Sequence, residues 1–136
     1  MDILSEIKKL NFDSSEYVII GGASMALRGL KETKDIDILI SQSLLEKLKR
    51  ESAWRHHPRI IPTDEAGLVN DDGTIELYPT IGSDIDLSFD LVKHNQEIVD
   101  GIPCISLNDL LLIKQTYKRE KDFNDIKLIE AYLASM

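Results

Sequence analysis

The sequence is poor in cysteine and aromatic residues, and it has no long hydrophobic run. Its 136 residues contain one cysteine, Cys104, so no disulfide can form within the chain. No apolar stretch approaches the roughly 18 residues that a membrane-spanning helix needs. The N-terminus, MDILSEIKKLNF, lacks the basic start and apolar run of a signal peptide. These absences predict a soluble, cytoplasmic protein with no membrane partner.

The chain also has too few basic residues to coat a nucleic acid. It carries 16 Lys and Arg against 24 Asp and Glu, which gives a formal net charge of −8. Because phosphate backbones are bound by clustered Lys and Arg, a general nucleic-acid coat is not expected. A local basic pocket remains compatible with this composition. Hydrophobic residues make up 43% of the chain, which is enough for one core.

The pattern of hydrophobic residues predicts a single domain over residues 1–136 with a mixed α/β, or α+β, architecture. The small mixed β-sheet should be flanked by helices. Helices are expected at residues 2–10, 23–30, 42–52, 107–119 and 121–134, with Ser41 and Ser106 as caps of the third and fourth. Strands are expected at residues 16–22, 35–40 and 74–79, and a hairpin should turn at Asp100-Gly101. Residues 54–70 contain two prolines and have no sustained period, so no element is assigned there.

Two aspartates lie one residue apart in the second strand, DIDILI. Because side chains alternate between the faces of a strand, Asp35 and Asp37 point the same way, within roughly 7 Å of each other. Two such carboxylates repel each other, and a divalent cation between them removes that repulsion. A half-buried strand with a solvated polar face is the alternative interpretation.

Gly21-Gly22 ends the first strand and precedes the second helix, ASMALRGL. Without side chains at these positions, a phosphate can approach the backbone N–H groups of Gly21, Gly22, Ala23 and Ser24. A tight strand-to-helix turn is the alternative. The glycine turn and the paired aspartates occur together here, in the order strand, Gly-Gly, helix, and a second strand that carries D-x-D.

That order resembles the nucleotidyltransferase superfamily whose best-known member is DNA polymerase beta. The family pattern is an apolar residue, Gly, Gly or Ser, a short spacer, acid–apolar–acid in a strand, and a third acid in a later strand. Here IGGASMALRGLKETKDIDIL places Asp35 13 positions after Gly22, inside the family's spacing. Arg28, Gly29 and Thr33 also resemble the small bacterial and archaeal members, including abortive-infection and minimal nucleotidyltransferase toxins.

The resemblance implies a third carboxylate in a neighbouring strand. Glu76, in TIELYP, is favoured, and Asp84 and Asp86, in SDIDLSF, are the alternatives. Asp35, Asp37 and Glu76 would bind the catalytic metal, Mg²⁺ or Mn²⁺. Glu76 would also draw the proton from the attacking hydroxyl.

Basic residues gather near the C-terminal end, in IKQTYKREKDFNDI. In the resembling family, cations of a similar segment face the nucleotide triphosphate, while Asp residues brace the helix pair. Lys114 and Arg119 are therefore candidate nucleotide-binding residues, ahead of Lys118 and Lys121. A solvated helix end is the alternative for all four, and Asp122 is expected to cap a helix or pair with Arg119.

The function expected from this resemblance is metal-dependent transfer of a nucleoside monophosphate from an NTP such as ATP to a hydroxyl. The acceptor would be a small molecule, an RNA end or a protein. Since the chain has little beyond a catalytic core, either its own loops bind the acceptor, or a protein partner or a second copy completes the site. The alternative is a non-catalytic binding or regulatory partner of the same fold, such as one component of a toxin–antitoxin pair.

Overall fold

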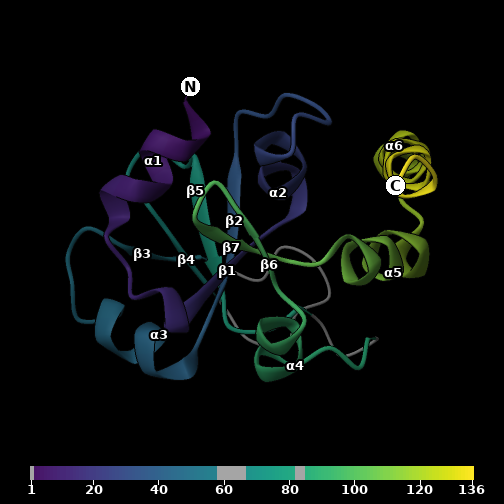
Figure 1. Ribbon diagram of the computed structural model, residues 1–136. Coiled ribbons are helices and arrows are strands. Elements are labelled where there is room, and N and C mark those ends of the chain that lie inside the picture. The colour runs from purple at the N-terminus through teal and green to yellow at the C-terminus, as the bar shows by residue number, and fades with distance from the viewer. Residues whose placement is uncertain (1, 58–66, 82–84) are drawn as a thin grey trace.

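A computed structural model describes residues 2–57, 67–81 and 85–136, and it shows one mixed sheet covered by helices on both faces (Figure 1). The helices are α1 (Ile3–Leu10), α2 (Gly21–Leu27), α3 (Gln42–Leu48), α4 (Phe89–His94), α5 (Leu107–Tyr117) and α6 (Glu120–Ala134), with a short 3-10 turn at Ser14–Glu16. The strands are β1 (Tyr17–Ile20), β2 (Ile36–Ile40), β3 (Arg55–His57), β4 (Gly67–Val69), β5 (Ile75–Tyr78), β6 (Glu97–Val99) and β7 (Ile102–Cys104).

The strands are ordered β3-β4-β5-β2-β1-β7-β6 across the sheet. β2 pairs with β1 in antiparallel fashion and with β5 in parallel, and β7 runs parallel to β1. The remaining pairs, β3–β4, β4–β5 and β6–β7, are antiparallel. The predicted α+β class with a mixed sheet is therefore confirmed.

Side-chain alternation in the central strands divides the core between the two faces of the sheet. Ile19, Ile36 and Ile38 pack on one face with residues of α1 and α3. Val18 and Leu39 pack on the other face with residues of α4, α5 and α6. Asp37 alternates with Ile36 and Ile38, so its side chain belongs to the face that α5 and α6 cover.

Local signals in the sequence explain several of these elements. The Ser41 and Ser106 side chains accept hydrogen bonds from the backbone N–H groups of Leu44 and Asp109, at 3.1 Å each, as caps of α3 and α5. Asp100 and Gly101 both have positive φ, 51° and 80°, and they connect β6 to β7 as predicted. α2 begins at Gly21, two residues earlier than expected, so both glycines lie in its first turn.

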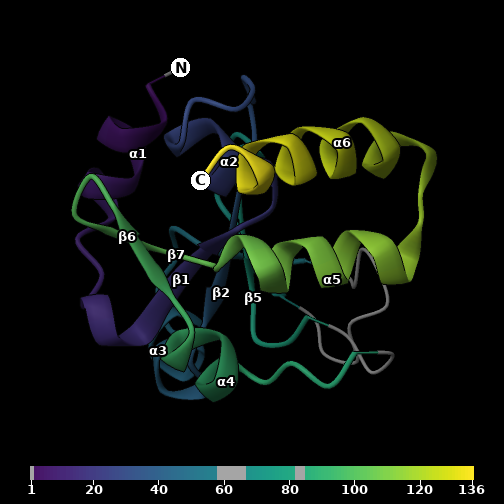
Figure 2. The same ribbon diagram turned by 45° about the vertical axis from the view of Figure 1, so that its right-hand side comes forward.

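The C-terminal helices form a hairpin beside the sheet. Figure 2 shows α5 and α6 running alongside each other, with α5 nearer the sheet. Among the described residues, no helix has the length and apolar character needed to cross a bilayer.

Candidate active site

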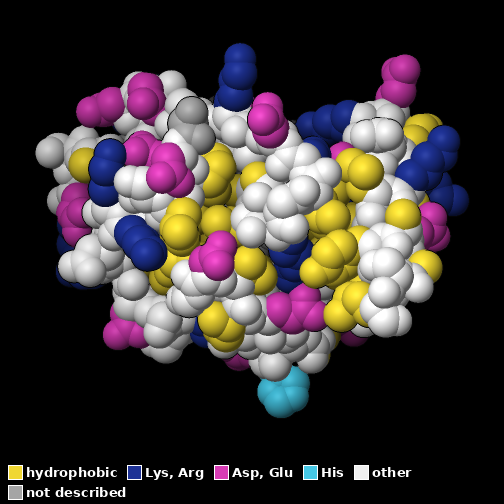
Figure 3. Space-filling view, turned by 45° about the horizontal axis from the view of Figure 1, so that its top comes forward, with side chains coloured by type: hydrophobic (Ala, Val, Ile, Leu, Met, Phe, Trp, Pro, Cys, Tyr) yellow, Lys and Arg dark blue, Asp and Glu magenta, His cyan; other side chains and the backbone are white. Residues whose placement is uncertain are grey.

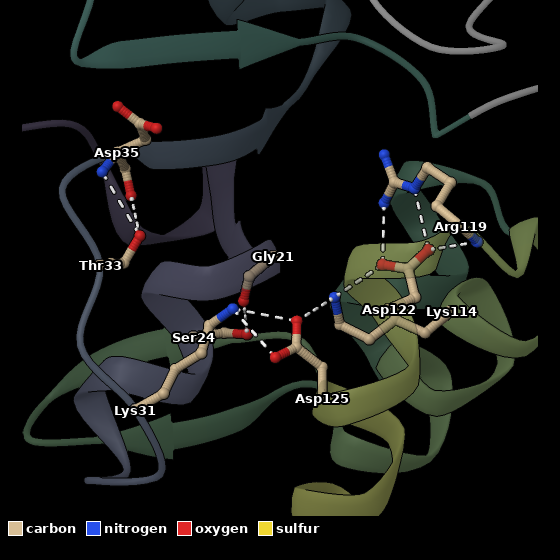
Figure 4. A network of polar contacts seen from close by, with 9 residues as sticks. All are labelled: Gly21, Ser24, Lys31, Thr33, Asp35, Lys114, Arg119, Asp122 and Asp125. Atoms are coloured by element: carbon tan, nitrogen blue, oxygen red, sulfur yellow. Dashed lines mark hydrogen bonds and ion pairs between the residues drawn. The ribbon is translucent and has the colours of Figure 1, made fainter.

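Two of the predicted carboxylates lie directly opposite each other in the sheet. β2 and β5 run parallel, and their register pairs Asp37 with Glu76. Both residues are half-buried, while Asp35 is exposed and precedes the first residue of β2. Figure 4 shows Asp35 beside Thr33, whose hydroxyl bonds the Asp35 backbone. The sheet thus sets Asp37 and Glu76 side by side, and Asp35 lies just before the strand that carries Asp37.

The surroundings of Asp37 disfavour its charged form. Burial, followed by the nearby Glu76 and Asp35 carboxylates, raises the pKa of its carboxyl to about 6, while Lys121 and Arg119 act in the opposite direction. The two basic side chains at the start of α6 therefore act on the carboxylate that β2 presents. A cation placed among these acids would relieve their repulsion.

The glycine turn fits closely against Asp37. Gly21 has a φ of +59°, which L side chains rarely adopt, and a Cβ there would lie 3.1 Å from Asp37 Oδ2. A Cβ at Gly22 would lie 3.2 Å from Thr33 Oγ1 and 3.3 Å from Lys31 Cε. Glycine at position 21 therefore lets the backbone approach the carboxylate.

The four residues predicted to meet a phosphate have different surroundings. Gly21 lines a cavity next to Asp37, whereas the Ala23 and Ser24 side chains are fully buried in the protein interior. The Ser24 hydroxyl donates to the Gly21 carbonyl at 2.6 Å, so it braces the turn from inside. A phosphate contact at this turn would use backbone N–H groups.

A cavity of about 80 Å³ adjoins Asp37. A single water needs only roughly 10–15 Å³ in this measure, so a larger group can enter. The cavity lies against the ends of β1, β2 and β5 and against α5 and α6, and its walls are Ile20, Gly21, Asp37, Tyr78, Thr80, Ile81, Leu110, Ile113, Lys114, Tyr117 and Arg119. In the space-filling view of Figure 3, hydrophobic and basic side chains meet in a hollow between the sheet and the α5–α6 hairpin.

Two hydroxyl groups of this cavity wall matter for its chemistry. The Tyr78 hydroxyl donates a hydrogen bond to Glu76, two residues earlier on the same face of β5. Burial raises the pKa of Tyr78, and the hydrogen bond to Glu76 raises it further, so the phenol is protonated at neutral pH. The Thr80 Oγ1 atom is buried and finds no hydrogen-bond partner within the described residues. A bound polar group in the cavity would satisfy it.

The two favoured basic residues, Lys114 and Arg119, are tied to the aspartates of α6 (Figure 4). Lys114 is buried, and its Nζ lies 3.3 Å from Asp122 Oδ1 and 3.0 Å from Asp125 Oδ2. Lys31, from the loop after α2, also reaches Asp125, at 2.9 Å. Lys114 therefore helps to brace the helix pair, a role that was predicted for the aspartates and not for Lys114.

Arg119 combines bracing with access to the cavity. Its Nε lies 2.8 Å from Asp122 Oδ2, and the Asp122 side chain in turn accepts from the Arg119 backbone N–H, at 3.1 Å. Its side chain is 30% exposed, against 7% for Lys114, and it lines the cavity beside Asp37. The predicted pairing of Asp122 with Arg119 is confirmed, and Arg119 is the cation best placed to meet a ligand.

Whether a metal ion fits this site depends on the ligand atoms that a bound substrate would add to those of the protein. Within the described residues, no three Asp, Glu, His or Cys side chains form a group that could hold a metal. Asp37 and Glu76 nevertheless offer hard carboxylate oxygens at neighbouring positions. Magnesium is usually bound by one or two carboxylates together with substrate phosphates and water. The site therefore fits a metal that arrives with a phosphorylated substrate, and it does not resemble a preformed cage of three side chains.

The alternative third carboxylates lie elsewhere. Asp86 is exposed and outside any strand, and Asp84 lies outside the described residues. Sequence reasoning missed Tyr78 and Lys31. Tyr78 lies two residues after Glu76 on the same strand, so both side chains project from one face, and this spacing is the signal that could have identified it. No local signal links Lys31 to Asp125, 94 residues away.

Two solved structures have the same fold. The crystal structure of TM1012 from Thermotoga maritima, a proposed nucleotidyltransferase, aligns over 98% of this chain and 92% of that one, with a TM-score of 0.54 and 20% identity. The solution structure of the antibiotic-resistance factor ANT(2'')-Ia aligns over 96% of this chain and 80% of its own, with a TM-score of 0.56 and 15% identity. No protein-family model and no curated protein matches the sequence. The chain thus has the nucleotidyltransferase fold that the motifs predicted.

Proposed function

We propose that this protein is a metal-dependent nucleotidyltransferase, which moves a nucleoside monophosphate from an NTP to a hydroxyl acceptor. One observation supports this function above all others. Asp37 and Glu76 are paired across β2 and β5, and Asp37 lines a cavity that Gly21 and Arg119 also line. Opposed carboxylates, a close backbone turn and a cation at one cavity are the groups that phosphoryl transfer requires, since its catalysis is mostly positioning and charge neutralisation.

Each group has a distinct task in this proposal. Arg119 contacts the triphosphate, and the backbone at Gly21 and Gly22 bounds the space for its phosphates. Asp122 holds the Arg119 guanidinium in place, and Lys114 holds Asp122. Glu76 accepts the proton of the attacking hydroxyl. The unpaired Thr80 hydroxyl would meet a polar atom of the substrate within the cavity.

A divalent ion, Mg²⁺ or Mn²⁺, belongs to the proposed site. Asp37 and Glu76 would hold it, with Asp35 as an outer ligand. When bound, the ion neutralises charge on the phosphates and on the three acids. We further propose that the acceptor is bound by the loops of this domain or by a protein partner or second copy.

The double substitution Asp35→Asn, Asp37→Asn tests the function. Wild-type protein should bind ATP by calorimetry only with Mg²⁺ present, and it should transfer labelled nucleotide from an NTP to an acceptor in cell extract. The double variant should fold, as judged by circular dichroism, and should lose both properties. Asp71→Asn, at an exposed turn, is the matched control. Transfer by the double variant would refute the mechanism, and a wild type that shows neither property would favour a non-catalytic binding partner.

A further inference from the structure

The Tyr78 hydroxyl contacts the carboxylate that the proposed reaction uses as its base. In the proposed reaction Glu76 takes the proton of the attacking group, and a general base must be within hydrogen-bond reach of that proton. The Tyr78 hydroxyl donates a hydrogen bond to the Glu76 carboxylate. The chain therefore contains a nucleophile and a base already in contact, which is the arrangement expected for a covalent acceptor.

The other groups of the site surround the same phenol. Tyr78 lines the cavity together with Gly21, Asp37 and Arg119. β5 supplies Tyr78 and Glu76 on one face, and the parallel register with β2 places Asp37 opposite Glu76. The phenol is thus directed into the cavity that would receive the phosphates, although only 8% of the residue is exposed.

We propose that Tyr78 is a site of self-nucleotidylation, an inference that rests on the proposed function. The Tyr78 phenolic oxygen attacks the α-phosphorus of the NTP and forms a new P–O bond. The bond from the α-phosphorus to the oxygen bridging to the β-phosphate breaks, and pyrophosphate leaves with that electron pair. The phenolic proton passes to Glu76. The product is a tyrosine phosphodiester that carries one nucleoside monophosphate.

The burial of Tyr78 determines how the transfer occurs. A phenol this enclosed cannot reach the cavity of a second molecule without unfolding β5, which is a central strand of the sheet. The transfer therefore takes place within one chain. The fraction labelled should rise at the same rate whatever the protein concentration, and each chain should accept a single nucleotide.

The test is to incubate the purified full chain with ATP and Mg²⁺, or with each of the other NTPs, and to measure its intact mass. We expect one added nucleoside monophosphate, mapped to Tyr78 by peptide fragmentation and stable to hydroxylamine. Tyr78→Phe should abolish the added mass. Tyr132→Phe, at a tyrosine of α6 outside the cavity, should retain it. Because Tyr117 lines the same cavity, fragmentation must distinguish the two peptides.

A mixing experiment tests transfer within one chain. Asp37→Asn keeps the Tyr78 phenol and lacks a working site. Incubated with ¹⁵N-labelled wild-type protein, ATP and Mg²⁺, Asp37→Asn should gain no mass while the wild-type chain gains one nucleotide, and labelling of Asp37→Asn would overturn intramolecular transfer.

The outcomes also separate this inference from the proposed function. A wild-type protein that transfers nucleotide to an external acceptor but never labels Tyr78 overturns the inference and leaves the function standing. Labelling at another residue also overturns it. Absence of metal-dependent ATP binding and of every transfer refutes both.

Discussion

At the scale of single residues, Asp37 and Gly21 depend on each other. The carboxylate of Asp37 occupies the space that a side chain at position 21 would fill, 3.1 Å from where its Cβ would be. The same carboxylate lies among Glu76 and Asp35, which makes its ionisation unfavourable. This arrangement costs stability while no cation is bound, and it favours the binding of a ligand that brings a cation.

Asp37→Asn should therefore stabilise the metal-free protein. Burial, followed by the neighbouring Glu76 and Asp35, raises the folded-state pKa of Asp37 from 3.8 to about 6. The folded protein then binds more protons than the unfolded chain between these values, so the stability contribution of Asp37 is lost as pH rises through about 6. At pH 8 in EDTA, urea unfolding should show the variant to be more stable by about 1–3 kcal/mol.

The pH profile gives the control for this prediction. The stability advantage of Asp37→Asn should shrink as the pH is lowered toward 4, because the wild-type carboxyl is then protonated. Asp71→Asn, at an exposed turn, should unfold like wild type at every pH. An advantage for Asp37→Asn that is equal at pH 4 and pH 8 would show that charge repulsion is not its cause.

How much of the site the sequence predicts depends on how local each signal is. Asp35 and Asp37 are visible as a pair within one strand, and the strand around Glu76 makes it a candidate. The two ion pairs of Lys114 are not visible in this way, since Asp122 and Asp125 lie eight and 11 residues away on another helix. The contact of Tyr78 with Glu76 depends on side-chain direction and burial, which only the folded chain supplies.

At the scale of elements, the correct predictions rest on signals within a few residues, and the missed ones depend on contacts between distant segments. Ser caps and the Asp100-Gly101 turn act over a few residues, so α3, α5 and the β6–β7 hairpin were predictable. β3 and β4 were not predicted, because each has only three residues and their pairing joins segments separated by residues 58–66. Pairing with β5 brings β4 into the sheet, and this pairing has no counterpart in local sequence.

The buried ion pairs between α5 and α6 should contribute to the stability of the fold. Burial alone would raise the pKa of Asp122, but its hydrogen bonds from Arg119 and the charge of Lys114 lower it overall. For Asp125 the opposition to burial comes from Lys31 and Lys114, and the pKa is again lowered. Lys114→Met removes one cation from both carboxylates, so it should destabilise the protein by roughly 3 kcal/mol at pH 7.

Urea unfolding at several pH values measures this effect. Lowered carboxyl pKa values stabilise the fold above the unfolded value near 3.8, and this stabilisation is lost as pH falls through the folded values. The cost of Lys114→Met should therefore diminish in acid. Lys127→Met, at an exposed position of α6, is the matched control and should cost less than about 0.5 kcal/mol. A cost for Lys114→Met no greater than the control would mean that the ion pairs do not brace the hairpin.

At the scale of the whole molecule, the cavity joins two parts that are distant in sequence. The sheet contributes Asp37 and Tyr78, the start of α2 contributes Gly21, and the α5–α6 hairpin contributes Tyr117 and Arg119. The ion pair between Lys31 and Asp125 also links the loop after α2 to α6 (Figure 4). A ligand held between the sheet and the hairpin must therefore stabilise their packing against each other.

Binding of an NTP with Mg²⁺ should accordingly stabilise the protein and protect both walls of the cavity. At a ligand concentration 100 times its dissociation constant, the free energy of unfolding should rise by about 2.7 kcal/mol. Hydrogen exchange should slow at residues 19–22 and 76–80 and also at residues 110–121, because the ligand contacts the sheet and the hairpin together. The same NTP with EDTA is the control and should protect neither segment. Protection confined to the hairpin would contradict a site shared between hairpin and sheet, since Asp37 and Glu76 would then have no part in binding.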